Sequence, residues 1–228
     1  MERGLYIAAS GMIAEQVRQN QIANDLANAS TPGYKADRSS QRSFGDMMLE
    51  NTVSGQAIGP IGEGVEIART VTDLQSAPVR ATGEPLDFAI EGQGFFELQT
   101  PQGLRYTRNG QFMRSAAGTL TDSLGNQVLG QNGRPITVNA AGTAAANPGI
   151  FNVTNPRKVG DSMFTGRAAG RGTGTVQNGA LESSGTNPAQ SMVDMITSER
   201  SYEAGQKAIH TIDETLQKAV TSVPSING

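Results

Sequence analysis

The sequence predicts an α+β fold in which one long helix at each end of the chain flanks an antiparallel β-sandwich or barrel-like body. Three observations point to this fold. Apolar residues recur at helical spacing near both ends, and they shift toward a period of two between those ends. Glycine and proline, with 28 and 10 residues among 228, interrupt the middle of the chain every few positions. We expect the two helices to pack together as a coiled coil.

The first helix is expected over residues 4–28. Its apolar residues follow one another mostly at spacings of three, four and seven, which is typical of an amphipathic helix. The helix should end before Pro32, because proline lacks an amide hydrogen and moves the preceding Thr31 away from helical backbone angles. The chain therefore leaves the helix through a turn that contains Gly33.

The second helix is expected over residues 188–223, with Asn187 as its N-cap and Pro224 beyond its end. Its apolar residues form a narrow stripe near the seven-residue spacing of a coiled coil, with polar Glu199 and Gln206 inside the stripe. The apolar members are Met192, Met195, Ile196, Tyr202, Ile209, Ile212, Leu216 and Val220. Both helices are only weakly apolar, so we expect them to fold fully only when copies pack side by side.

Short strands should make up the middle of the chain, because apolar residues alternate there and turn-forming residues separate the runs. The expected strands are 65–71, 88–90, 95–99, 104–107, 118–121, 128–129, 136–138 and 150–153. Their spacing is typical of an antiparallel sandwich or barrel. Residues 140–148 and 160–179 are rich in small residues, and we expect loops or linkers there.

The composition leaves little room for catalysis or metal binding. The chain has no cysteine and a single histidine, His210, which excludes disulfides, thiolate nucleophiles and multi-histidine metal centres. His210 lies near Asp213 and Glu214 on the expected second helix, where a surface His–acid pair is favoured over a general base. We therefore expect no cofactor, no metal site and no enzyme activity.

The 18 basic and 21 acidic residues argue against a broad nucleic-acid-binding surface. Their distribution is uneven, since residues 39–96 contain three basic and eight acidic residues, whereas residues 97–171 contain eight basic and three acidic ones. Such blocks form solvated faces, which we favour, or they face each other between subunits.

No apolar run reaches the length of about 18 residues that membrane insertion needs. Residues 5–14 lack the flanking residues of a cleaved signal peptide.

Three blocks of the sequence together resemble the rod and hook proteins of the bacterial flagellum. The first is an Asn/Ala-rich helix end at residues 21–30 that continues into Thr31-Pro32-Gly33-Tyr34-Lys35. The second extends from Gly92-Gln93-Gly94-Phe95-Phe96 through residues 106–112 to residues 125–130, and it is similar to the family's β-rich body. The third begins at Gly179-Ala180-Leu181-Glu182 and resembles the family's C-terminal signature, from which residues 184–187 and 199–202 depart in part.

The resemblance implies a structural subunit of the flagellar basal-body rod. Such a subunit would be exported without a cleaved signal peptide and would assemble through its terminal helices into the axial tube, which transmits torque and conducts exported subunits. Its expected partners are copies of itself, other rod proteins, hook-side axial proteins and the flagellar export apparatus, with no nucleic acid and no membrane insertion. The chain length is similar to that of a rod subunit, and the stretch Gly33-Tyr34-Lys35-Ala36-Asp37 through Phe44 and Met47 is closest to the proximal-rod type.

The resemblance also divides the chain into four parts. Residues 1–35 are expected to form the N-terminal axial helix and signature turn, 36–80 an extended connector with short strands, 81–178 the β-rich body, and 179–228 the C-terminal axial helix. The subunit interface should lie on the two helices and the signature turn. Its expected residues are Leu5, Met12, Ile22, Asn24, Leu26, Asn28, Thr31, Gly33, Tyr34, Met192, Met195, Ile196, Tyr202, Ile209, Ile212 and Leu216.

Two alternatives stay open at this point. Within the family, the chain could be a distal-rod or other hook-basal-body protein. Outside it, the chain could be a soluble β-rich binding module or carbohydrate-active enzyme that binds sugar through Glu or Asp in a groove. Helices that are stably folded in a dilute monomer would favour this second alternative.

Overall fold

The computed structural model describes residues 2–43, 46–50, 57–62, 64–160 and 162–222. The chain divides into two compact units. The helical unit contains residues 1–26, 37–71 and 188–228, and the β body contains residues 27–36 and 72–187. The order of elements confirms the α+β class, with a helix at each end and strands between them.

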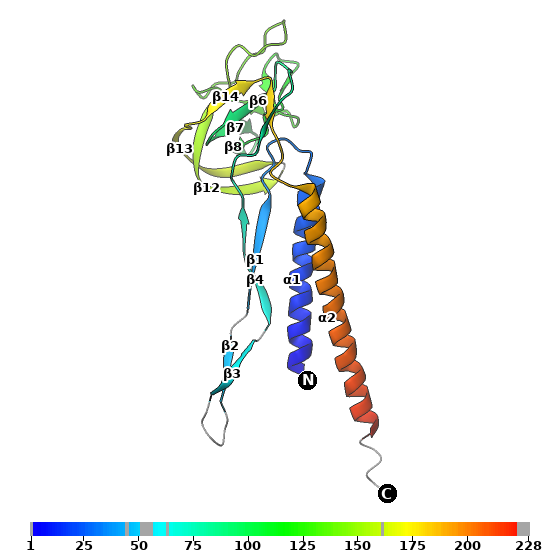
Figure 1. Cartoon of the computed structure of the whole chain (residues 1–228). Coiled ribbons are helices and arrows are strands. Elements are labelled where there is room, and N and C mark those ends of the chain that lie inside the picture. Colours follow the sequence, from blue (N-terminus) through cyan, green and yellow to red (C-terminus); the bar gives the residue numbers. More distant parts are fainter. Residues whose placement is uncertain (1, 44–45, 51–56, 63, 161, 223–228) are drawn as a thin grey trace. The chain divides into compact units, whose positions relative to one another are not determined.

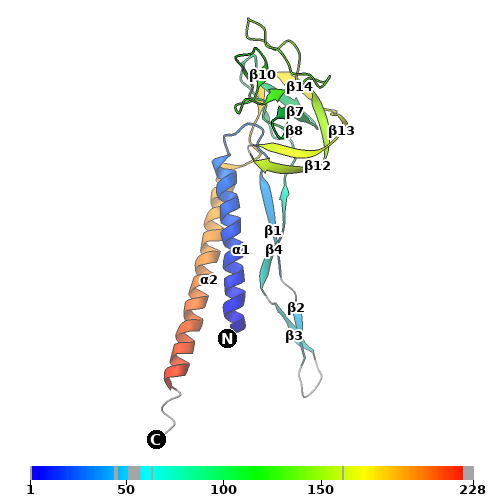
Figure 2. The same cartoon turned by 180° about the vertical axis from the view of Figure 1, so that it is seen from behind.

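Two long antiparallel helices form most of the helical unit. Helix α1 spans Glu2–Ala27 and helix α2 spans Pro188–Ser222, which confirms both expected helices. They lie side by side in both views (Figures 1 and 2). Close contacts join Gly4 to Ile212, Met12 to Gly205 and Glu15 to Ser198, so the numbering rises along one helix as it falls along the other.

The face that α2 turns toward α1 repeats every seven residues. Apart from the half-buried Asp194, the partly or fully buried positions of α2 follow at alternating spacings of four and three, as in a coiled-coil seam. These positions are Ser191, Met195, Ser198, Tyr202, Gly205, Ile209, Ile212 and Leu216. The expected placement of Glu199 and Gln206 inside the seam is wrong, because both are exposed and the small residues Ser198 and Gly205 occupy the seam instead. A Cβ at position 205 would come within 2.7 Å of Met12 Cγ, so a larger residue there would require the Met12 side chain to move.

The rest of the helical unit is a pair of two-stranded ribbons. Strand β1 (Asp37–Ser43) pairs with β4 (Val65–Thr72), and β2 (Asp46–Glu50) pairs antiparallel with β3 (Ala57–Gly62). A two-stranded ribbon alone is only marginally stable. Polar side chains of α1 bind the first ribbon, since Ser10 Oγ accepts the Val65 amide at 3.3 Å and Asp25 accepts the Asp37 amide at 3.4 Å.

The β body is built around one seven-stranded sheet and two short two-stranded sheets. The large sheet has the order β12-β13-β8-β7-β11-β10-β9, while β14 pairs with β6 and β15 with β5. The strands are β5 Val79–Ala81, β6 Phe88–Glu91, β7 Phe95–Thr100, β8 Gly103–Thr107, β9 Met113–Arg114, β10 Leu120–Thr121, β11 Gln127–Val128, β12 Ile150–Gly160, β13 Met163–Arg171, β14 Thr175–Asn178 and β15 Ala180–Glu182. The strand pairings described within the body are all antiparallel.

Four strands of the large sheet close into a ring, which gives the body its barrel-like character. Strand β12 pairs with β13 on one side and with the first residues of β7 on the other, and β8 joins β7 to β13. Phe95, Tyr106 and Phe164 pack together, and Phe151 and Val153 pack against them. Each of the four strands therefore contributes to one apolar cluster, while a second and larger core cluster contains the neighbouring residues of β7.

Two sequence expectations for the β body are wrong. The small-residue stretch 160–179 is not a loop, because it contains β13 and β14. Its glycines are needed for close packing: a Cβ would come within 2.3 Å of Val153 at Gly166 and within 2.2 Å of Ile150 at Gly172. Within residues 136–138, Thr137 and Val138 form isolated bridges rather than a strand, although Ile136 and Val138 are buried in the larger core cluster.

Candidate functional site

The segment that follows α1 is held in the β body by the C-terminal signature. We call residues 28–36 the signature turn. The Gly33 amide donates to the Glu182 carbonyl at 2.9 Å, and the Gly185 amide donates to the Tyr34 carbonyl at 2.9 Å. The Ser184 hydroxyl donates to the Asn28 carbonyl, also at 2.9 Å. The first and third blocks of the family resemblance, which lie near opposite ends of the sequence, therefore meet at one site.

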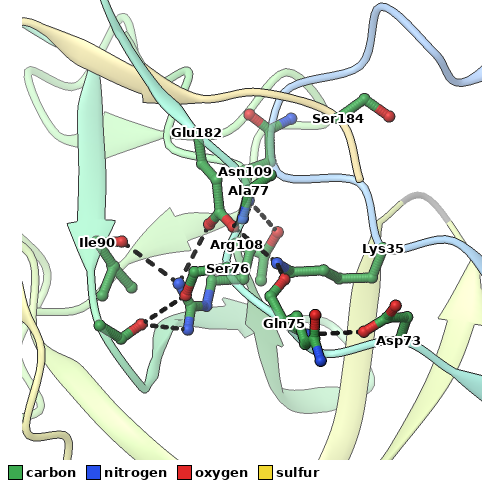
Figure 3. A network of polar contacts seen from close by, with 12 residues as sticks. Lys35, Asp73, Gln75, Ser76, Ala77, Ile90, Arg108, Asn109, Glu182 and Ser184 are labelled. Carbon is green, nitrogen blue, oxygen red and sulfur yellow. Dashed lines mark hydrogen bonds and ion pairs between the residues drawn. The ribbon is translucent and has the colours of Figure 1, made fainter. Parts of the chain in front are cut away.

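A buried ion cluster joins the same two blocks to the middle of the chain. Lys35 Nζ lies 2.7 Å from Glu182 Oε1, and an Arg108 guanidinium nitrogen lies 3.1 Å from Glu182 Oε2 (Figure 3). All three side chains are nearly inaccessible to solvent, with exposed fractions of 1%, 0% and 3% for Lys35, Glu182 and Arg108. The Ala77 amide also donates to Glu182 Oε1, at 2.8 Å. Removing one member of such a buried pair is strongly destabilising, because the remaining charge loses its partner.

Two cations share the single carboxylate of this cluster. Burial lowers the pKa of Lys35, Glu182 raises it by its charge and its hydrogen bond, and nearby Arg108 lowers it further. Backbone oxygens supply additional acceptors: Lys35 donates to the Gln75 carbonyl, and Arg108 donates to the Gly92 carbonyl at 2.7 Å. The network therefore depends on Glu182 as the acceptor that both cations contact.

Gly33 and Tyr34 fit the signature turn for separate physical reasons. Gly33 has a φ of 64°, in the left-handed region, and a Cβ there would lie 2.2 Å from the Arg108 carbonyl oxygen. Both the backbone angle and the close contact therefore require glycine at this position. The Tyr34 ring is buried beneath Lys158, whose Nζ lies 3.9 Å from the ring centroid and donates to the Lys35 carbonyl at 2.8 Å.

The helices expose several large apolar side chains, including some that the sequence did not single out. Tyr6, Ile13 and Val17 are exposed by 61%, 63% and 42%, and their spacings of seven and four place them on one face of α1. On α2, Met192 and Ile196 are exposed by 54% and 52%. Exposed apolar side chains aligned along a helix are typical of a protein–protein contact.

The expected interface residues fall into three groups. Asn24, Met192 and Ile196 are exposed, whereas Gly33 and Tyr34 are buried in the signature turn. The remaining expected residues are half-buried, namely Leu5, Met12, Ile22, Leu26, Asn28, Thr31, Met195, Tyr202, Ile209, Ile212 and Leu216. The helical spacing that selected these residues is the same for apolar side chains buried within one chain and for those buried between chains. An exposed stripe such as Tyr6, Ile13 and Val17 has the same spacing, so spacing alone does not separate the two.

Two kinds of feature are absent from the described residues. No group of three or more metal-ligating side chains occurs among them, and none of their helices is long and apolar enough to span a bilayer. A surface pocket of about 420 Å³ in the β body has Glu84 and Asp87 among its lining residues. Asp87 accepts the Thr82 hydroxyl at 2.7 Å and is 7% exposed, which indicates a structural role in the turn before β6.

Comparison with known proteins yields three family matches, one for each block. The flagella basal body rod protein family matches residues 5–35, the flagellar hook protein FlgE/F/G D1 domain matches residues 89–150, and the flagellar basal body rod FlgEFG protein C-terminal family matches residues 177–222. The matches follow one another along the chain in the order expected for an axial protein of the flagellum.

Curated relatives extend the similarity to almost the whole chain. The flagellar basal-body rod protein FlgG of Agrobacterium fabrum is 31% identical over 93% of this chain and 96% of its own length. FlgG of Borreliella burgdorferi is 30% identical over 95% of this chain and 97% of its own length. The flagellar hook-basal body complex protein FlhO of Bacillus subtilis is 28% identical over 99% of this chain and all of its own length.

The combination of paired terminal helices, an inserted β body and these matches defines a flagellar axial protein. The chain belongs to the family of flagellar basal-body rod proteins, which confirms the family expected from the sequence. It is a structural rod subunit located at the flagellar basal body. None of the family descriptions or relatives' names reported above indicates an enzyme.

Proposed function

We propose that this rod subunit is not an enzyme and assembles through its terminal helices into the axial tube, which transmits torque and conducts exported subunits. The observation that carries the proposal is the exposed apolar stripe of α1, formed by Tyr6, Ile13 and Val17. Burying these side chains against neighbouring subunits would stabilise the assembly by about 1.5–3 kcal/mol for each large apolar residue. Exposed Met192, Val193 and Ile196 offer a second apolar patch on α2.

The two helices of one subunit are proposed to form a coiled coil. The seven-residue repeat of buried positions on α2 supports this, as do the close contacts between Met12 and Gly205 and between Gly4 and Ile212. The seam also contains Ser198, whose hydroxyl donates to Glu15 Oε2 at 2.5 Å. Because the seam is partly polar, we propose that the helices gain most of their order upon assembly. Hydrogen exchange in dilute monomer tests this point: strong protection throughout α1 and α2 would contradict it.

The place of the subunit in the rod is a separate proposal. We infer a proximal-rod position from the resemblance at residues 33–37, since the names of the relatives specify the rod and not a level along it. The proposed partners are copies of the chain, other rod proteins, hook-side axial proteins and the export apparatus. The axial segments would be residues 1–35 and 179–228, with the connector at 36–80 and the β-rich body at 81–178. Labelling the subunit in purified basal bodies tests the position directly.

The assembly surface is tested by placing a charge on the exposed stripe. Ile13→Asp should prevent incorporation into basal bodies and abolish swimming, because a charge would be buried between subunits. Its effect on the thermal melt of the monomer should stay within about 0.5 kcal/mol, as for other exposed positions. Gln16→Asp, at another exposed position of α1, is the matched control for the same added charge.

The choice of Ile13 follows from its exposure. Leu26→Asp and Ile209→Asp would also impair assembly, but both residues are half-buried within the subunit, so these changes alter its own packing as well. Normal incorporation and motility of the Ile13→Asp protein, measured in a strain that lacks the wild-type subunit, would contradict the proposed interface.

A further inference from the structure

The buried ion cluster of the signature turn draws its members from three distant parts of the chain. Glu182 follows Lys35 by 147 positions and Arg108 by 74 positions. Residues 28–36 themselves follow directly after α1, near the beginning of the chain. We propose that strand β15 closes the signature turn, so that residues 28–36 become ordered only in a chain that has folded through residue 185.

The charges of the cluster supply the first argument. Without Glu182, the closed turn would bury the Lys35 ammonium and the Arg108 guanidinium close together with no carboxylate in contact with either. Asp73 raises the pKa of Lys35 too, but its contribution is the smallest of those that act on this group. The carbonyl oxygens of Gln75, Ile90 and Gly92 accept hydrogen bonds from the two cations but carry no net charge. Burying a cation without a counter-charge costs free energy. The turn should therefore not form until β15 brings Glu182 into contact with the two cations.

The backbone of the turn supplies the second argument. The Gly33 amide, the Tyr34 carbonyl and the Asn28 carbonyl all find their partners in residues 182–185. Within the turn, the Thr31 amide donates to the Asn28 carbonyl at 3.1 Å and the Tyr34 amide donates to the Thr31 carbonyl at 3.3 Å. Elsewhere in the turn, the Lys35 carbonyl accepts Lys158 Nζ and the Ala36 carbonyl accepts the Asp73 amide, each at 2.8 Å. Three backbone groups of residues 28–34 therefore depend on the C-terminal segment, and buried backbone groups require such partners.

This arrangement makes order at one end of the chain depend on the other end. A chain that has folded only its first 170 residues retains the pairing partners of β7 and β8, but it lacks the carboxylate and the backbone groups that hold the signature turn. The segment after α1 then becomes fixed only in a complete subunit. The turn would act as a conformational checkpoint that separates complete subunits from incomplete ones.

Hydrogen exchange on the full-length chain with Glu182→Gln tests the proposal. The glutamine has the same shape but no charge. We expect the amides of Thr31 and Tyr34, whose bonds lie within the turn, to exchange at least about tenfold faster. The amides of β7 and β8 should keep their protection. Glu66→Gln, which neutralises the carboxylate paired with Arg42 on the exposed ribbon, is the matched control and should leave the turn unchanged.

A double variant distinguishes charge balance from simple loss of packing. Lys35→Met combined with Glu182→Gln removes one of the two buried cations and should restore at least part of the protection of Thr31 and Tyr34. Unchanged exchange at both amides in Glu182→Gln would overturn the proposal, because the turn would then form without the carboxylate. A failure of the double variant to restore any protection would overturn the argument from charge.

If Glu182→Gln destabilises the whole β body, refolding of the wild-type chain provides a second test of the proposal. In pulse-labelling experiments, Thr31 and Tyr34 should become protected in the same phase as the amides of residues 180–182. Protection of the two turn amides in an earlier phase would overturn the proposal, since the turn would close before β15 is in place.

Discussion

Gly33→Ala offers a direct test of how the signature turn is packed. The wild-type residue has a φ of 64°, and its amide donates to the Glu182 carbonyl at 2.9 Å. An alanine Cβ would lie 2.2 Å from the Arg108 carbonyl oxygen and 2.5 Å from the Asn109 amide nitrogen. Both neighbours are backbone atoms, so no side-chain rotation relieves the overlap.

The expected loss of stability has two parts. The left-handed backbone conformation costs an alanine about 1–2 kcal/mol. Relieving the overlap requires the turn to move away from Arg108, which weakens the Gly33–Glu182 hydrogen bond, worth about 1 kcal/mol. Gly133→Ala is the matched control, because Gly133 has a similar φ of 70° and no atom lies within 4 Å of the position that an alanine Cβ would take there. The control should therefore lose only the first part.

Urea unfolding followed by circular dichroism measures both variants. Gly33→Ala should lose about 1 kcal/mol more than Gly133→Ala, which corresponds to roughly 2–4 °C in the melting temperature for a domain of this size. Hydrogen exchange of the Thr31 and Tyr34 amides should accelerate in the first variant and not in the second. Equal losses in the two variants, together with unchanged exchange in the turn, would refute the reasoning.

Three further changes test the β body and the ion pairs. Lys35→Ala should destabilise the β body by about 1.5–3 kcal/mol, because it removes the buried, charge-assisted hydrogen bond to Glu182 Oε1, although Arg108 still balances the Glu182 charge. Arg42→Ala on the exposed pair with Glu66 should cost less than about 1 kcal/mol, and similar losses in urea unfolding would contradict this contrast. Phe164→Ala should lower the free energy of unfolding by about 3–5 kcal/mol, because the side chain is fully buried in the apolar cluster with Phe95 and Tyr106. Leu124→Ala, at a position with 59% exposure, should change the melting temperature little. Burial raises the pKa of Glu97 and the hydrogen bond from Tyr106 lowers it in part, so the folded state holds this proton more tightly than the unfolded state; stability should fall as pH rises from the ordinary pKa of a glutamate to the raised one. Glu97→Gln should then be more stable than wild type at neutral pH, with a difference that shrinks on acidification, and a pH-independent difference in melting temperature would argue against it.

Local patterns in the sequence predict the two helices and several of the strands. The termini of α1 and α2 follow from apolar spacing and from Pro32 and Pro188, because a helix makes its backbone hydrogen bonds within its own segment. Strands β4, β6, β7 and β8 follow from alternation between turn residues. The flagellar family is predicted for the same reason, since each of the three signature blocks is recognised from short stretches of neighbouring residues.

Strands β13 and β14 show where such patterns fail. Their segment is rich in glycine, and glycine alone predicts a loop. Glycine is required at those positions because Val153, Ile150 and Ile90 occupy the space that a side chain would need. The requirement comes from residues that are distant in sequence, so no pattern within the segment indicates it.

The sequence alone therefore establishes the two helices, a β-rich middle and a flagellar axial family. The tertiary structure decides that four strands close into a ring, that Ser198 and Gly205 replace Glu199 and Gln206 in the helix seam, and that Lys35, Arg108 and Glu182 form one buried cluster. The physical reason is the range of the interactions. Helix capping and strand alternation act over a few residues, whereas ring closure, seam register and the pairing of buried charges depend on side chains that only the folded chain brings into contact.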